Sequence, residues 1–163
     1  MSTVIAGSDV YAIAEDLFAA MVDGQPGTLR PWQGPPPDWH DPVVAWVELH
    51  GGWSGCAAVT TGRATADALA RALLAMPDDE PVADEDLRDA FGEIANVVGG
   101  NVKSLLPVTG TLGLPQVARA APEVPGSVVV AHVLLDWGGR ALELTVRATP
   151  AGEAVGRERG GAR

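Results

Sequence analysis

The most regular pattern of apolar positions in the chain lies between Asp84 and Leu106, and Pro107 closes it. At about 100° per residue, six apolar side chains fall within an arc of about 80°, which is typical of the core-facing stripe of an amphipathic helix. The opposite side is polar, with spacings of three and four residues. We therefore predict one helix with two unlike faces. The apolar stripe comprises Leu87, Phe91, Ile94, Val98, Val102 and Leu105, and the polar face comprises Asp89, Glu93, Asn96, Gly100 and Lys103.

The polar face carries few side chains around Glu93 and Asn96, because Gly92, Gly99 and Gly100 flank or share it. Each glycine costs about 1 kcal/mol relative to alanine inside a helix. Their presence indicates a surface that another molecule can approach closely. Two other interpretations stay open on pattern alone. A polar stripe on an amphipathic helix is usually a solvated face. The pair Gly99 and Gly100 is also consistent with a C-terminal cap that ends the helix early.

Shorter patterns elsewhere predict two more helices and two β-hairpins. The second hairpin is the clearer one, because Leu142, Leu144 and Val146 alternate with polar residues and a glycine pair supplies the turn. The order of the elements predicts an α+β domain in which helices cover an antiparallel β-sheet. The predicted elements are helices at 8–24 and 64–76, hairpins of strands 43–50 with 54–61 and 127–137 with 140–149, and a short strand at 116–120.

A chain of 163 residues that is 47% hydrophobic and 20% charged is suited to one globular domain. We place this domain at residues 8–149. Within it, six prolines between positions 25 and 42 exclude a helix and an interior strand, so we predict a Pro-rich surface loop there. Residues 150–163 are rich in glycine and charge, and we predict a disordered tail.

The net charge of −10 argues against nucleic acid and anionic membrane as partners, because phosphate is neutralised by Lys and Arg clusters and the chain has none. A protein or small-molecule partner is expected instead. The single cysteine, Cys56, excludes an internal disulfide. With no signal peptide and no apolar run long enough to span a bilayer, we predict a cytoplasmic protein. The three histidines lack metal-ligand spacing, so no metal site is expected.

The spacing Asp89-x3-Glu93-x2-Asn96 resembles the signature of the CheC/CheX phosphatases, bacterial proteins that dephosphorylate chemotaxis response regulators. The likeness continues through residues 97–104 and through Leu112-Gly113-Leu114-Pro115-Gln116-Val117. Residues 51–59 and the helix after them resemble the hairpin and helix that precede this motif in CheX-like domains. The resemblance covers most of residues 8–147 and implies the CheX-like α+β architecture. Two-site relatives carry a second Glu-x2-Asn motif in the first helix, which is lacking here because Phe18 stands three residues after Glu15.

This resemblance implies a phosphatase that docks a helix face on the phosphorylated receiver domain of a response regulator. Asn96 would orient the hydrolytic water, since a carboxamide can hold water without bringing negative charge near the phosphoryl oxygens. Glu93 would pair with a lysine of the receiver and fix the register in which Asn96 enters. Asn96 and Glu93 are thus the expected catalytic residues. The Mg²⁺ would be held by the receiver, so we expect no cofactor in this chain.

Asp89, Gly92, Gly100 and Lys103 complete the expected partner-binding face around Glu93. For Asp89, local support of the helix surface is an equally good interpretation, and for Lys103 solvation is the better one. Known CheX-like proteins pair through sheet edges, so the resemblance also implies a homodimer. The alternative function is a non-catalytic module of the same fold that binds a receiver or another signalling protein, as in flagellar-switch relatives.

Overall fold

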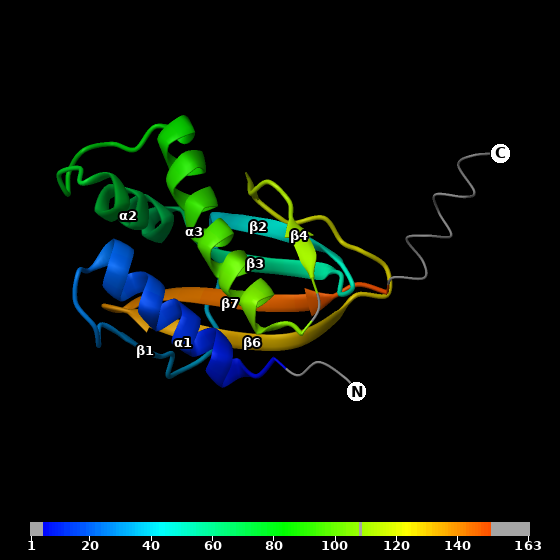
Figure 1. Ribbon diagram of the computed structural model, residues 1–163. Coiled ribbons are helices and arrows are strands. Elements are labelled where there is room, and N and C mark those ends of the chain that lie inside the picture. The colour runs from blue at the N-terminus through cyan, green and yellow to red at the C-terminus, as the bar shows by residue number, and fades with distance from the viewer. Residues whose placement is uncertain (1–4, 108, 151–163) are drawn as a thin grey trace.

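A computed structural model describes residues 5–107 and 109–150, in which three helices lie on one face of an antiparallel β-sheet (Figure 1). The predicted fold class is therefore confirmed. The predicted tail falls outside the described residues, apart from Pro150. The elements are α1 (Gly7–Leu17), the π-helical turn η1 (Phe18–Val22), β1 (Leu29–Pro31), β2 (Pro42–Gly51), β3 (Gly55–Gly62), α2 (Arg63–Leu74), α3 (Asp84–Leu105), β4 (Gly110–Leu112), β5 (Gln116–Ala118), β6 (Val128–Trp137) and β7 (Arg140–Ala148).

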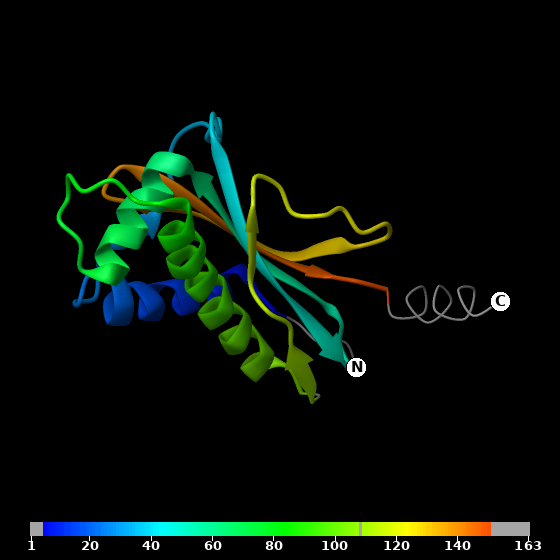
Figure 2. The same cartoon turned by 90° about the horizontal axis from the view of Figure 1, so that it is seen from above.

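The sheet runs in the order β1-β6-β7-β3-β2-β4, and β5 also pairs with β2. Both predicted hairpins are present, as β2–β3 and β6–β7. Gly138 and Gly139 turn the second hairpin at φ values of 59° and 89°, which glycine adopts without steric cost. Seen from above, the helices lie on one side of the sheet and the yellow segment that leads into β6 lies on the other (Figure 2).

The core lies between the helices and the sheet. Phe91, Ile94 and Val98 of α3 are at most 2% exposed, as the apolar stripe predicts. From the sheet, the alternating residues Leu142, Leu144 and Val146 of β7 are buried against the same cluster. Leu105 departs from the prediction: it is the final residue of α3 and is 46% exposed. The buried stripe therefore ends one turn earlier than predicted, at Val102.

The first helix differs from its prediction at both ends. It begins at Gly7 rather than after Ser8, because the Asp9 carboxylate accepts a hydrogen bond from the Ala6 N–H at 2.9 Å and so holds the first turn. From Phe18 the chain continues as the π-helical turn η1, closed by a bond from the Asp23 N–H to the Phe18 carbonyl. This wider turn places the buried Phe18 ring edge-on against Trp137, with ring centroids 5.6 Å apart.

Two short strands were not predicted. β1 lies inside the Pro-rich segment 25–42 and pairs with the end of β6. It is an edge strand of three residues, where Pro31 is tolerated because an edge does not need every backbone N–H. β4 pairs with the end of β2 and lies beside α3 (Figure 1). Helix α2 also ends two residues early, at Leu74, where Ala75 takes a left-handed conformation.

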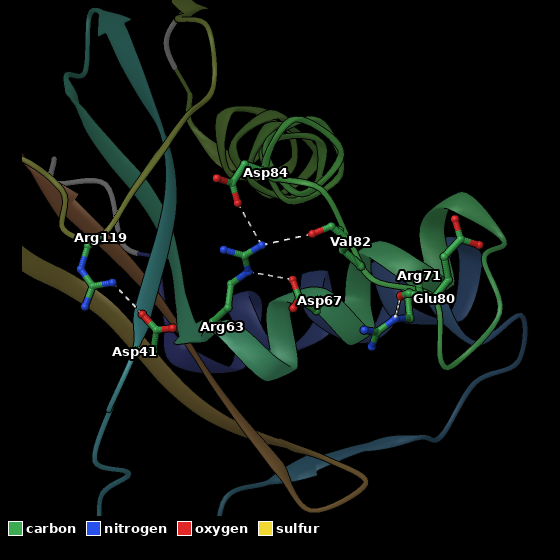
Figure 3. A network of polar contacts seen from close by, with 8 residues as sticks. All are labelled: Asp41, Arg63, Asp67, Arg71, Glu80, Val82, Asp84 and Arg119. Carbon is green, nitrogen blue, oxygen red and sulfur yellow. Dashed lines mark hydrogen bonds and ion pairs between the residues drawn. The ribbon is translucent and has the colours of Figure 1, made fainter.

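Arg63 fixes the start of α3 (Figure 3). Its guanidinium contacts the Asp67 carboxylate at 2.8 Å within α2 and the Asp84 carboxylate, at the first residue of α3, at 3.1 Å. It also donates to the Val82 carbonyl at 3.3 Å. The hydrogen bond to Asp67 is the main cause of the raised pKa of Arg63, and burial opposes it. One partly buried side chain thus ties the beginnings of two helices together.

Candidate functional site

Helix α3 is continuous from Asp84 to Leu105, with Gly92, Gly99 and Gly100 inside it. The interpretation of Gly99 and Gly100 as an early helix cap is therefore wrong. The helix ends at Leu105, and the N–H of the next residue, Leu106, donates to the Lys103 carbonyl before Pro107. Acidic residues fill the first turn, where they interact favourably with the helix dipole.

Glu93 and Asn96 lie on the side of α3 that faces away from the sheet. Glu93 is exposed and Asn96 is half-buried, one helical turn further along. Within the described part of the chain, neither side chain makes a hydrogen bond or ion pair. The contrast with neighbouring residues is clear: Asn101 donates to the Val97 carbonyl at 2.8 Å and so is satisfied by its own helix. The carboxylate and the carboxamide are thus available to another molecule.

The three glycines of α3 have different surroundings. A Cβ at Gly99 would lie 2.2 Å from Val47 Cγ2, and one at Gly92 would lie 3.5 Å from Pro115 Cβ. Both glycines are buried. At Gly99 the missing side chain makes room for Val47, whereas the distance at Gly92 is an ordinary van der Waals contact that an alanine could make. Gly92 was expected in the partner-binding face, but the structure buries it beneath Pro115 and Val117. At Gly100 nothing lies within 4 Å of an added Cβ. No packing contact within the protein therefore explains a glycine here, although glycine destabilises a helix relative to alanine.

The remaining predicted site residues are spread along the same helix face. Asp89 is exposed, and Lys103 is half-buried two turns beyond Asn96. Neither forms an ion pair with another described residue. Together with Glu93 and Gly100, they give a mostly acidic ridge about four turns long.

Residues 112–117 border this ridge, and sequence reasoning assigned none of them a role. Leu112 lies against Gly99, and Pro115 and Val117 lie against Gly92. The segment therefore follows α3 past Asn96. Its only sequence signal was the likeness of Leu112 to Val117 to the tail of the motif.

A cavity of about 760 Å³ lies elsewhere, on the sheet face opposite the helices. Its lining includes Trp46, Cys56 and Arg147 but neither Glu93 nor Asn96. The candidate site is thus a ridge and not a pocket. That shape suits a surface that enters a cleft on another protein rather than one that encloses a small molecule.

Residues 5–107 and 109–150 hold no group of three or more His, Cys, Asp or Glu side chains that could bind a metal ion. In the same residues, no helix has the length and apolar character that crossing a membrane requires.

Comparison with known proteins identifies the fold and the family. The structure resembles a chemotaxis protein CheX from Desulfovibrio desulfuricans, with a TM-score of 0.67 and 20% identity over 87% of this chain and 97% of that one. It also resembles CheX from Borrelia burgdorferi, solved as a CheX–CheY–BeF3–Mg complex, with a TM-score of 0.65 and 14% identity over 88% and 97% of the two chains. No curated protein gave a match. The family model of the chemotaxis phosphatase CheX matches residues 43–126, just over half of the chain, and the protein therefore belongs to the CheX family.

Proposed function

We propose that this protein is an aspartyl-phosphate phosphatase that acts on the phosphorylated receiver domain of a response regulator. The observation that carries the proposal is the pair Glu93 and Asn96, which lie one turn apart on a continuous helix with no partner among the described residues. The match to the CheX family supports the reaction. The Borrelia structure, which contains CheX together with CheY, supports a receiver as the partner.

Asn96 performs the chemical role in this proposal. An aspartyl phosphate hydrolyses once a water molecule lies in line with the phosphorus atom, so positioning that water is a sufficient contribution. The Asn96 carboxamide can donate one hydrogen bond and accept another, and it adds no negative charge near the phosphoryl oxygens. A carboxylate at this position would repel them.

Glu93 positions the complex. Its exposed carboxylate pairs with a lysine beside the phosphoryl group of the receiver, in a charge-assisted hydrogen bond. Because Glu93 and Asn96 are fixed on one helix, this contact sets the depth and direction in which the carboxamide enters the receiver. Carboxylates of the receiver hold the Mg²⁺ ion, and this chain contributes no ligand to it.

The phosphoryl half-life of a receiver from the same organism tests the proposal. Addition of the protein is expected to shorten this half-life, in proportion to concentration until the receiver is saturated. Glu93→Gln keeps the shape of the side chain and removes its charge. The protein concentration needed for half of the maximal effect should then rise by about tenfold. Unchanged half-lives with every receiver of the organism would reject the function. Binding without any change in rate would instead identify a non-catalytic receiver-binding module.

We also propose that the protein forms a homodimer through the free edge of β6. Strand β7 pairs with one edge of β6 along its length. On the other edge, among the described residues, β1 covers only the end of β6, from Leu135 to Trp137, and leaves residues 128–133 without a partner strand on that side. Val128, Val129 and Val130 on that edge are 57%, 49% and 38% exposed. Unpaired backbone groups beside exposed apolar side chains favour pairing with a second strand.

Sedimentation equilibrium of the wild type and of Val129→Lys tests the dimer. The wild type should sediment as a dimer, and the lysine variant should shift toward the monomer, because charge on an edge strand opposes pairing. Circular dichroism of both proteins confirms that the fold is kept. A wild type that stays monomeric at high micromolar concentration would exclude this dimer.

A further inference from the structure

Leu114 is the most exposed of the large apolar side chains in the described residues, at 85%. It lies between β4 and β5, which both pair with β2. Leu49 of β2 pairs with Leu112, and Trp46 of β2 pairs with Gln116. Between these two pairs, the connection from β4 to β5 has three residues, whereas β2 has two. One residue more than the partner strand is the mark of a β-bulge, which redirects a side chain and is common beside functional sites.

The backbone holds Leu114 in place from both sides. On one side, the Gly113 N–H donates to the Glu48 carbonyl at 2.7 Å. On the other side, the Pro115 ring, whose φ is fixed, lies against Gly92 of α3. Single exposed leucines are common on protein surfaces. A leucine on an anchored backbone differs from these, because ordering the segment costs little when a partner covers it.

The same contacts place Leu114 on a segment that runs alongside the turn of α3 that carries Asn96. Residues 112–117 lie against Gly99 at one end and Gly92 at the other, so they follow α3 over about two turns. Asn96 lies between the two glycines in sequence and about 40° to 60° further round the helix, toward solvent. Leu114 lies near the middle of the bordering segment and therefore at the level of the carboxamide.

We propose that Leu114 is an apolar anchor for the receiver domain. Its side chain packs against a hydrophobic recess of the receiver, next to the phosphorylated carboxylate. This inference rests on the proposed function. The receiver is the occupant because Leu114 continues the surface formed by Glu93 and Asn96, and a protein that engages that pair also covers the bordering segment. Burial of an apolar side chain adds affinity that salt does not screen, whereas the contact of Glu93 is screened.

Leu114→Ala tests the anchor, with Leu74→Ala as the matched control. Leu74 is 43% exposed at the end of α2 and loses the same atoms outside the proposed surface. Phosphate release is measured against receiver concentration, with acetyl phosphate as phosphodonor, and binding to the receiver is measured separately by titration. Both are done at about 50 and 300 mM salt, between which screening lengths differ roughly twofold.

For Leu114→Ala we expect Kd and KM to rise about tenfold and kcat to change much less, as for loss of one buried apolar contact. The dependence of Kd on salt should stay that of the wild type, while Glu93→Gln should flatten it. Leu74→Ala should match the wild type. An unchanged Kd in Leu114→Ala would overturn the anchor and leave the phosphatase intact. A wild type that binds the receiver without turnover would reject the proposed function, and the Kd of Leu114→Ala would still test the anchor. A wild type that binds no receiver would overturn both.

Discussion

Gly92 of α3 lies beneath Pro115, and an added Cβ would make an ordinary van der Waals contact, at 3.5 Å, with the Cβ of the proline. This contact joins the helix that carries Glu93 and Asn96 to the segment that carries Leu114. It also removes Gly92 from the exposed part of the polar face, because Pro115 and Val117 cover this position. The surface offered to a partner is therefore narrower than the glycine content implies, and it centres on Glu93, Asn96 and Gly100.

Substitution of Gly99 and Gly100 by alanine should have opposite effects on stability. A Cβ at Gly99 would lie 2.2 Å from Val47 Cγ2, a stiff and fully buried side chain, so Gly99→Ala should lower the free energy of unfolding by about 1–2 kcal/mol. Gly100→Ala meets nothing within 4 Å and should raise it by about 0.5–1 kcal/mol. Urea denaturation measures both changes. Equal effects of the two substitutions would be inconsistent with this packing.

Gly100→Ala should also weaken binding of the receiver. The added methyl group occupies surface that the structure leaves open, beside Asn96 on the same helix face. We expect a higher Kd from a protein that is more stable, which separates this effect from misfolding. Titration of the receiver together with urea denaturation gives both quantities. Receiver binding as tight as that of the wild type would remove Gly100 from the contact surface.

Loss of Arg63 should cost more than loss of Arg119. Arg63→Met removes contacts to two carboxylates and leaves the Val82 carbonyl without its guanidinium donor, so we expect a loss of about 1–2 kcal/mol in the free energy of unfolding. Arg119→Met breaks a pair with Asp41 in which both side chains are mostly exposed (Figure 3), and should cost less than about 0.5 kcal/mol. Thermal and urea unfolding compare the two, and a reversed order would contradict the role given to Arg63.

The thiol of Cys56 should react slowly in the folded protein. Burial, and next the nearby Glu48, raise its pKa from 9.0 to about 11, while Arg147 opposes the shift. At pH 8 the thiolate fraction is then roughly a hundredfold lower than in the unfolded chain. The rate of iodoacetamide labelling against pH should rise with a midpoint near 11 in buffer and near 9 in urea. Since the folded pKa is the higher one, the thiol stabilises the fold below about pH 9, and this contribution is lost as the pH rises toward 11.

The elements with strong internal periodicity could be predicted from the sequence. Leu142, Leu144 and Val146 alternate, and the stripe of α3 from Leu87 to Val102 repeats at helical spacing, so neither depends on distant residues. The short strands β1 and β4 could not be predicted, because three residues carry no period and their pairing is decided by β6 and β2. The π-helical turn at Phe18 likewise packs against Trp137, more than a hundred residues away, and no local pattern reports this contact.

The candidate site was predictable in part for the same reason. Glu93 and Asn96 share a helix face by spacing alone, whereas the neighbours of a glycine depend on the tertiary structure. Gly92 and Gly100 therefore look alike in the sequence and differ in the fold, one beneath Pro115 and the other open. The position of Leu114 depends on a register difference between two strands, which no local pattern reports.

The most direct test of the catalytic role of Asn96 is the decay of the phosphorylated receiver in the presence of saturating Asn96→Ala protein. We predict that the half-life returns to that of the receiver alone while Kd stays within about threefold of the wild type, because the carboxamide orients water and adds little to docking. An Asn96→Ala protein that shortens the half-life as much as the wild type does would contradict the account.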